Sequence, residues 1–574
     1  MSRLTLGNVL PVLARHISTA FALQITDPQH PDYGGIVYPE WGLAAAGSAT
    51  SFITGCGFVY LAHMGHQHHA LDLDPAELLA KASLAAEYLR RVQRPSGLID
   101  LRDCNYDSSP DTGFSVQMLC TLIELGRPMA QLDPDLAALL DQVEQFIRRA
   151  VPGMCTGGFH TPNHRWVIAS ALAQTGQLFT DLDIRSVLEA YLAEGFDLDV
   201  EGAFHERSSG VYDAVCDRSL LLIADNWACT TTRPTVKTNL EFNLHLLHAD
   251  GTIETGLSRR QDYGTAVVPL TLASCYLYSA AIEPNPVFVR TAQTLWENAR
   301  TPNPSELNWL AYVLLKFGDP APSSAPLPQD YSRWFLHNGL WRVRRGPLSA
   351  SFFRGGTRLF TLRFGQAELG SVKISANYFG TAGGWFIGDS LDVHDNIGTF
   401  RSEGLGRPRR PGYELPMGRP VPSERYEEML PERSLRRVPP LTSTLTVQEV
   451  QGGFDLHYQT LDGLDCVTAQ IAFDFAPGGT WETDDACFQP QAGQVIFVKR
   501  GYGTMRYGSD VIQIGPGADA HRMWSMRDAE PAPHHARVLM TFVAPIDHRF
   551  SIRAWHGLAP PANGDSVQHA SRRM

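Results

Sequence analysis

The residues best suited to chemistry begin in a short polar segment, TPNHRW, at positions 161–166. Thr161 followed by Pro162 is typical of a helix start, because threonine can cap a helix and proline fits its first position. Asn163 and His164 then fall in the first turn, where backbone N–H groups lack partners and the helix dipole is positive. Such an end favours an anion, although a plain capped and exposed helix end has the same pattern.

Two further polar groups follow along the chain. The segment 199–218, DVEGAFHERSSGVYDAVCDR, places Glu206 and Tyr212 directly before an apolar helix. Tyr212 is either an acid or base, or a half-buried packing residue with its hydroxyl on a backbone group. In the segment 248–264, HADGTIETGLSRRQDYG, Arg260 either faces water or is held by a nearby aspartate so that it binds a carboxylate through two hydrogen bonds.

Histidines elsewhere give weaker indications. His394 lies between Asp392 and Asp395, which could hold its ring, although an exposed loop histidine is the alternative. The three histidines of MGHQHHA (64–70) lack the spacing of a helical metal pair and have no nearby thiolate, so we predict no metal. Glycine-rich phosphate loops and the GxSxG elbow are missing from the sequence, so we expect no cofactor.

Composition restricts the class of protein. The 574 residues exceed the roughly 250–300 at which a single core stops growing, so we expect two domains. A net charge of −12, from 48 basic and 60 acidic residues, argues against nucleic-acid binding. Nine scattered cysteines form no CxxC pair and fit a reduced, cytoplasmic protein. A periplasmic or secreted protein that has lost its signal peptide is the alternative. The oligomeric state stays open, with a homodimer as one option.

The N-terminal segment MSRLTLGNVLPVLARHISTAFAL is the one candidate for targeting. Asn8, Pro11, Arg15 and His16 interrupt its apolar run, which makes it a poor signal peptide. No stretch reaches about 18 uninterrupted apolar residues, so we expect no membrane span and no membrane partner.

The elements that must position these residues change character along the chain. Up to residue 318 the apolar spacing is helical, as in 74–93 and 133–151, and paired helices closed into a ring would bury a continuous face. Residues 319–330 are rich in proline and serine and read as a linker. From 331 to 574, alternating segments separated by glycine turns predict an antiparallel β-sandwich. Within it, the Arg- and Pro-rich stretch 400–438 predicts either a surface loop or a loop over an acidic-ligand site.

Taken together, the order of these features resembles the heparinase II/III-like polysaccharide lyases, including the alginate and oligoalginate lyases. The shared features are an Asn-His pair at a helix start, the motif ExSxxxY at Glu206, Ser208 and Tyr212, and a histidine in the second domain. The resemblance implies a multidomain α+β fold, with an incomplete (α/α) toroid followed by an antiparallel β-sandwich. It also implies cleavage of a uronic-acid glycan by β-elimination.

The resemblance also implies roles for individual residues. Asn163 and His164 would bind and neutralise the uronate carboxylate, Tyr212 would be the acid and base, and His394 would be a second base or an orienting group. We expect the anionic oligo- or polysaccharide substrate to contact further side chains, namely Arg165, Trp166, Glu206, Arg260 and Trp41. The family's His-rich HxHxD stretch has no counterpart at 364–380, which bears on the role of His394.

Three other functions remain open at this point. A glycoside hydrolase on a similar toroid would need two carboxylates across a cleft, for which Asp111, Glu206 and Asp262 are the candidates. A uronyl C5-epimerase would exchange the C5 proton without cutting the chain. A glycan-binding protein without activity would keep its affinity after Tyr212→Phe.

Overall fold

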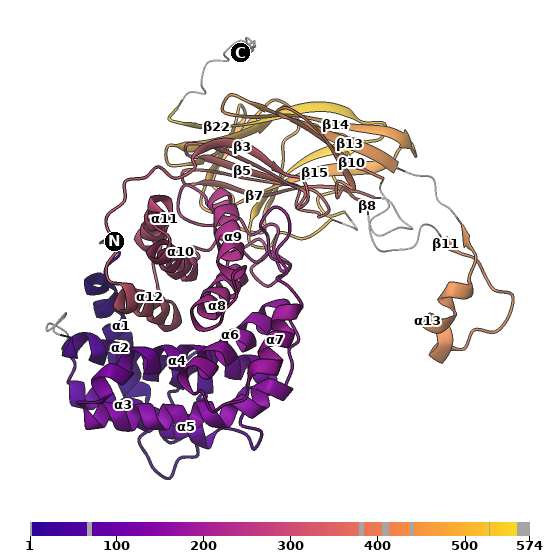
Figure 1. Cartoon of the computed structure of the whole chain (residues 1–574). Helices are drawn as coiled ribbons and strands as arrows, with labels where there is room; N and C mark the ends of the chain where they lie inside the picture. The colour runs from indigo at the N-terminus through magenta and orange to yellow at the C-terminus, as the bar shows by residue number, and fades with distance from the viewer. Residues whose placement is uncertain are drawn as a thin grey trace. The chain divides into compact units, whose positions relative to one another are not determined.

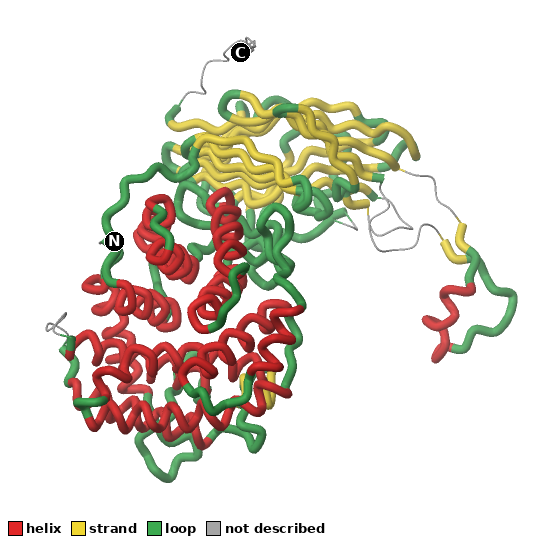
Figure 2. Tube along the Cα trace, in the orientation of Figure 1, coloured by secondary structure: helices red, strands yellow, loops and turns green. Residues whose placement is uncertain are grey.

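The computed structural model describes residues 3–65, 72–377, 384–403, 413–436, 441–526 and 529–558. The chain divides into two compact units, Met1–Leu327 and Pro328–Met574. Figure 1 follows both along the chain, and Figure 2 shows the first as helical (red) and the second as stranded (yellow). Between the last helix of the first unit and the first strand of the second, residues 318–329 form neither.

Helices of the first unit alternate between an inner and an outer ring. The inner helices are α2 (Ala46–Met64), α4 (Ser109–Ala130), α6 (Pro162–Leu178), α8 (Tyr212–Asn226), α10 (Leu270–Ile282) and α12 (Pro304–Phe317). The outer helices are α1 (Leu6–Leu23), α3 (Pro75–Arg91), α5 (Pro134–Thr156), α7 (Arg185–Ala193), α9 (Thr232–Leu246) and α11 (Pro286–Asn298). Each inner helix contacts the next, and α12 contacts α2, so the inner ring closes on itself.

Capping residues mark where several of these helices begin. Asp74 accepts a hydrogen bond from the Ala76 amide at the start of α3, and Asn303 forms a capping box with Glu306 at the start of α12. Because each inner helix is followed by an outer helix that runs back, the inner helices share one direction. Their N-terminal ends therefore meet at one end of the ring, together with the loops that precede them.

Helix α1 has a mean hydropathy of 1.2 over its 18 residues, enough by length and composition to cross a membrane. The core helices of globular proteins and signal sequences can have the same length and apolar composition. Here α1 packs on α2 and α12, and its Val9, Leu10, Leu13 and Ile17 are buried. Pro11 and the polar residues interrupt its apolar run, and the expectation of no membrane span stays a prediction.

The second unit consists of two large sheets. The first contains β3 (Asp330–Phe335), β4 (Leu340–Arg345), β5 (Leu348–Phe353), β6 (Phe360–Phe364), β7 (Ala367–Ala376), β8 (Gly384–Trp385), β15 (Thr468–Phe475), β18 (Val495–Phe497) and β21 (Ala536–Val543). The second contains β9 (Ser390–His394), β10 (Ile397–Ser402), β13 (Leu441–Val450), β14 (Gly453–Gly463), β16 (Thr480–Thr483), β17 (Ala486–Phe488), β19 (Gly503–Tyr507), β20 (Asp510–Gly515) and β22 (Asp547–His556). Described strand pairs are antiparallel, except for β18 beside β21.

Aromatic side chains from both sheets fill the space between them. Trp341 and Phe360 of the first sheet stack on Phe352, and Phe454 of the second meets Phe352 edge-on at 4.9 Å between ring centroids. In the second sheet, β13 and β14 are joined by a two-residue turn in which Gly452 has φ 72°, a conformation that favours glycine. The predicted α/α toroid followed by an antiparallel β-sandwich is thus confirmed, with the refinement that the inner ring closes.

Two short pieces complete the described elements. In the first unit, β1 (Ile99–Leu101) pairs with β2 (Asn105–Ser108) ahead of α4. In the second, β11 (Tyr413–Glu414) pairs with β12 (Leu435–Arg436), and η1 (Ser423–Arg425), α13 (Tyr426–Met429) and η2 (Leu430–Glu432) lie between them. The Arg-rich stretch 400–438 therefore has some regular structure, and its residues 404–412 and 437–438 lie outside the described residues.

Candidate active site

A chain of polar contacts joins the residues predicted from the sequence at one end of the helical ring. The Asn163 amide donates to Glu206 Oε2 at 2.7 Å, and Glu206 Oε1 lies 3.3 Å from the Arg260 guanidinium. Arg260 lies over the Tyr212 ring, 4.6 Å from its centroid, and Gln261 Nε2 donates to the Tyr212 hydroxyl at 2.8 Å. Segments far apart in the sequence therefore meet around one tyrosine.

These residues are held in place by the starts of two inner helices and two loops. Thr161 and Pro162 begin α6 as predicted, although the Thr161 hydroxyl accepts from the Asn163 side chain at 3.2 Å and does not cap the helix. The Ser208 hydroxyl accepts from the Tyr212 amide and donates to Asp262 at 2.9 Å. The serine of the ExSxxxY motif thus ties the tyrosine to the loop that carries Arg260.

Asp262 is a structural tie between the two loops. Its Oδ1 accepts from the Ser208 and Ser258 hydroxyls, and its Oδ2 accepts from the Gly210 amide at 3.1 Å. The side chain is buried and both oxygens are used. Asp262 is therefore poorly suited to the hydrolytic role considered for it from the sequence.

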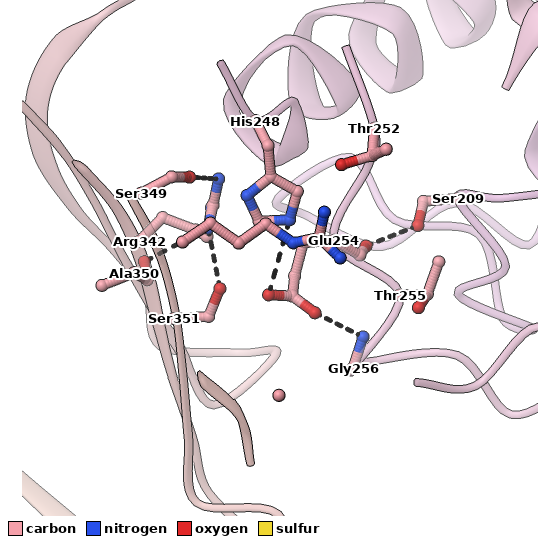
Figure 3. Close-up of polar contacts among 12 residues, drawn as sticks. Ser209, His248, Thr252, Glu254, Thr255, Gly256, Arg342, Ser349, Ala350 and Ser351 are labelled. Atoms are coloured by element: carbon pink, nitrogen blue, oxygen red, sulfur yellow. Dashed lines mark hydrogen bonds and ion pairs between the residues drawn. The ribbon is translucent and has the colours of Figure 1, made fainter. Parts of the chain in front are cut away.

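Figure 3 shows a second set of bonds that fixes the same loops. Ser209 donates to the Glu254 carbonyl at 2.7 Å, and the Glu254 carboxylate accepts from the Gly256 amide at 2.8 Å. His248 Nε2 lies 3.9 Å from the same carboxylate. In the second unit, Arg342 donates to the Ser351 hydroxyl at 2.7 Å and so braces β4 against β5.

His164 is a buried, neutral imidazole. It is 8% exposed, with the His160 ring 4.6 Å away and the Phe114 ring 6.0 Å away, both edge-on. Burial, helped by His160 and Arg260, lowers the pKa of His164 from 6.5 to about 4. At neutral pH it can therefore form hydrogen bonds to a carboxylate, but it brings no positive charge to neutralise one.

Several buried polar atoms of this cluster lack a hydrogen-bond partner among the described residues. They are Asn163 Oδ1, His164 Nδ1 and Arg260 Nε. Buried polar groups are nearly always satisfied, and a group left unsatisfied costs about 1–3 kcal/mol. A polar ligand or water at this end of the ring would satisfy them.

The structure contradicts two of the predicted substrate contacts. Trp166 is 0% exposed, packs on Phe196, and donates its indole N–H to Asp197 at 2.8 Å. Arg165 forms ion pairs with Glu194 at 2.7 Å and with Asp197 at 2.8 Å. Both side chains donate to Asp197 in the loop after α7, so this loop and not a ligand occupies their polar groups.

His394 and Trp41 lie apart from this cluster along the chain. His394 is exposed at the end of β9, the edge strand of its sheet, and it pairs in register with Ile397 of β10. In the described part of the chain neither Asp392 nor Asp395 bonds to its ring, which agrees with the alternative of an exposed histidine; its role as a base or orienting group stays a prediction. Trp41 is 63% exposed and lines a cavity in the first unit, and its contact with a substrate stays a prediction.

That cavity has a volume of about 520 Å³ and opens among the N-terminal ends of α2, α4 and α12. Its lining includes Asp111, Phe114, Arg218 and Trp309. Since Phe114 also contacts His164, the cavity adjoins the Tyr212 cluster. Its size is that of an ordinary small-ligand site.

Sequence reasoning gave no role to Gln261, His160 or Phe114. Gln261 adjoins Arg260, so its position in a polar loop was a usable signal. Phe114 and His160 gave none, because their contacts with His164 depend on how the helices pack. The three histidines of 64–70 begin at residue 66 and lie outside the described residues, and the described residues contain no cluster of three or more metal-binding side chains.

Comparison with known proteins finds similarity in structure alone. No family model matches the sequence, and no curated protein matches it. A heparinase III crystal structure aligns over 96% of this chain and 85% of its own, with 10% identity and a TM-score of 0.53. A second heparinase III structure aligns over 96% and 84%, with 10% identity and a TM-score of 0.50.

The Streptomyces coelicolor A3 chondroitin AC lyase, solved in complex with chondroitin sulphate, aligns over 96% of this chain and 79% of its own. Its identity is 13% and its TM-score is 0.53. The chain thus has the fold of these polysaccharide lyases across both units, which confirms at the level of fold the resemblance given by the short motifs.

Proposed function

We propose that this protein is a lyase that cleaves a uronic-acid-containing glycan by β-elimination. The observation that carries the proposal is the Tyr212 hydroxyl, which is bonded to Gln261 beside Arg260 and lies at the same end of the ring as Asn163 and His164. The fold shared with three polysaccharide lyase structures supports it.

The proposed reaction needs one group that takes a proton and later returns it. Tyr212, as the phenolate, removes the C5 proton of the uronate, and the C–H electron pair moves onto C5 and its carboxylate as an enolate. The enolate then collapses to a C4=C5 double bond while the C4–O4 bond breaks. The Tyr212 hydroxyl protonates the departing O4, so no water is consumed and the phenolate is restored.

The remaining residues stabilise the charge that develops. Arg260 is the cation of the cluster, and fixed donors in a water-poor site stabilise an enolate more strongly than water does. His164 is neutral, so its part is to form hydrogen bonds to the substrate carboxylate. Asn163 donates its amide to Glu206 and so orients that carboxylate against Arg260.

A glycoside hydrolase would need two available carboxylates. The described geometry favours it less, because Asp262 uses both oxygens, Glu206 is bound by Asn163 and Arg260, and Asp111 accepts from the Ser108 and Asn105 side chains. No observation favours it over elimination. An epimerase would use the same proton-abstracting groups and is an outcome of the test.

The test is incubation with a panel of uronate oligosaccharides, while the ultraviolet absorbance of an unsaturated uronate is followed. The proposal expects a rise with the unmodified chain and a loss of at least about 100-fold with Tyr212→Phe. Tyr191→Phe on outer helix α7 is the matched control and keeps full activity. Cleavage without the new chromophore would indicate a hydrolase. Exchange of the C5 proton without cleavage would indicate an epimerase.

A further inference from the structure

Outside the Tyr212 cluster, Arg218 is a buried cation without an anion. It lies on α8, is 6% exposed, and lines the 520 Å³ cavity. No ion pair or hydrogen bond reaches its guanidinium from any described residue, and its buried Nε has no partner. A buried and unpaired charge is costly, so a group that remains charged here requires compensation from a ligand or from solvent.

The neighbouring acids do not supply that compensation. Asp217, the adjacent residue, is fully buried with both carboxyl oxygens unpartnered, forms no ion pair with Arg218 among the described residues, and has its pKa held well above the usual range by burial. Burial lowers the pKa of Arg218 only to about 10, which leaves the guanidinium charged at neutral pH. The cavity therefore contains a lasting positive charge.

The other walls of the cavity suit a sugar ring. The Arg218 guanidinium lies over the Trp309 ring, 4.3 Å from its centroid, and this contact orients the cation. Trp41 adds an exposed aromatic face. Three acids also line the cavity: Asp100 is paired with Arg94 at 2.5 Å, Asp111 accepts hydrogen bonds from neutral side chains, and Asp103 is exposed. Among the described residues none of the three forms an ion pair with Arg218.

We propose that this cavity is a second glycan subsite, in which Arg218 binds the carboxylate or sulfate of an anionic sugar residue while the exposed face of Trp41 contacts its ring. Arg218 is six residues after Tyr212 on α8, about 9 Å further along the helix axis. The subsite therefore takes a residue of the chain other than the one that reacts. This deepens the proposed function and rests on it only in taking the ligand to be a glycan.

The experiment is calorimetric titration of the full chain with D-glucuronate, D-glucose 6-sulfate and D-glucose. These monosaccharides have no glycosidic bond to cleave, so binding is measured whether or not the protein is a lyase. We expect the two anions to bind and glucose to bind at least about 10-fold more weakly, since hydrogen bonds to a charged group are the strong ones. The anion that binds more tightly shows whether the subsite prefers a carboxylate or a sulfate.

Arg218→Met should weaken anion binding by about 10- to 100-fold, and Arg148→Met on outer helix α5 is the matched control that leaves it unchanged. Unchanged anion affinity in Arg218→Met, equal affinity for glucose, or no saturable binding of either anion each overturns the proposal.

If Arg218→Met does not fold, tryptophan fluorescence is the second measurement: glucuronate must alter the emission of the unmodified chain more than that of Trp309→Phe. An equal change overturns it. Lyase activity with Arg218-independent binding would refute the subsite alone. Arg218-dependent binding without cleavage would refute the lyase alone.

Discussion

Replacing His164 with glutamine should make the helical unit less sensitive to acid. In the folded protein the pKa of His164 is about 4, against 6.5 for a free imidazole. Between these two values the unfolded chain binds a proton that the folded chain refuses, so stability is lost as the pH falls from above 6.5 to 4. The difference in pKa corresponds to about 3 kcal/mol, a large part of the stability of a typical domain. Glutamine has no proton to gain and lacks this loss.

The assay is urea unfolding followed by far-ultraviolet circular dichroism, which reports on the helices. The free energy of unfolding is measured for both proteins at pH 7.5 and at pH 4. Carboxylates elsewhere titrate equally in both proteins and cancel in the comparison. We expect the unmodified chain to lose about 3 kcal/mol more than His164→Gln over this range. Equal losses would mean that His164 is not a buried neutral imidazole, and its assigned part in the site would fail with it.

Three further outcomes follow from the same geometry. Burial raises the pKa of Asp213 from 3.8 to about 7, so the folded chain loses stability as the pH rises from 4 to 7. In urea unfolding, Asp213→Asn should therefore be more stable than the unmodified chain by up to about 4 kcal/mol at pH 8. At pH 4 the two proteins should have similar stability. Trp166→Ala should cost about 3–5 kcal/mol of unfolding free energy, because the side chain is fully buried. Trp41→Ala should leave the Tm unchanged and weaken only ligand binding. A stable Trp166→Ala together with a destabilised Trp41→Ala would contradict the burial of these residues. Gln261→Ala should lower kcat about 10-fold with little change in KM, because Gln261 contacts the reacting hydroxyl. Steady-state kinetics that show a raised KM and an unchanged kcat would mean that Gln261 takes no part in the proton transfer.

Much of the fold was predictable because short segments of the sequence carry the signals for helices, strands and turns. Helix α3 begins at an aspartate cap before proline, and its apolar residues recur at helical spacing over 74–93. The strands of the second unit alternate, and a glycine with positive φ marks the β13–β14 turn. Closure of the inner ring could not be read in this way, since it depends on contacts between α2 and α12, which are more than 200 residues apart.

The candidate site was predictable in type and less so in detail. The residue types at Asn163, Glu206, Tyr212 and Arg260 pointed to an anionic substrate, and the structure brings them together. Trp166 misled, because a tryptophan beside a polar helix start looks the same in sequence whether it faces a ligand or the core.

The protonation of His164 and the isolation of Arg218 could not be foreseen. Both depend on which neighbours bury the group, which spacing along the chain does not encode.

The central claim is elimination at a uronate, and the masses of the products test it most directly. A defined uronate oligosaccharide is incubated with the unmodified chain and with Tyr212→Phe, and the products are weighed by mass spectrometry. Elimination predicts two fragments whose masses add up to that of the substrate, formed by the unmodified chain and not by Tyr212→Phe. Fragments that together carry one added water would contradict the claim and identify a hydrolase.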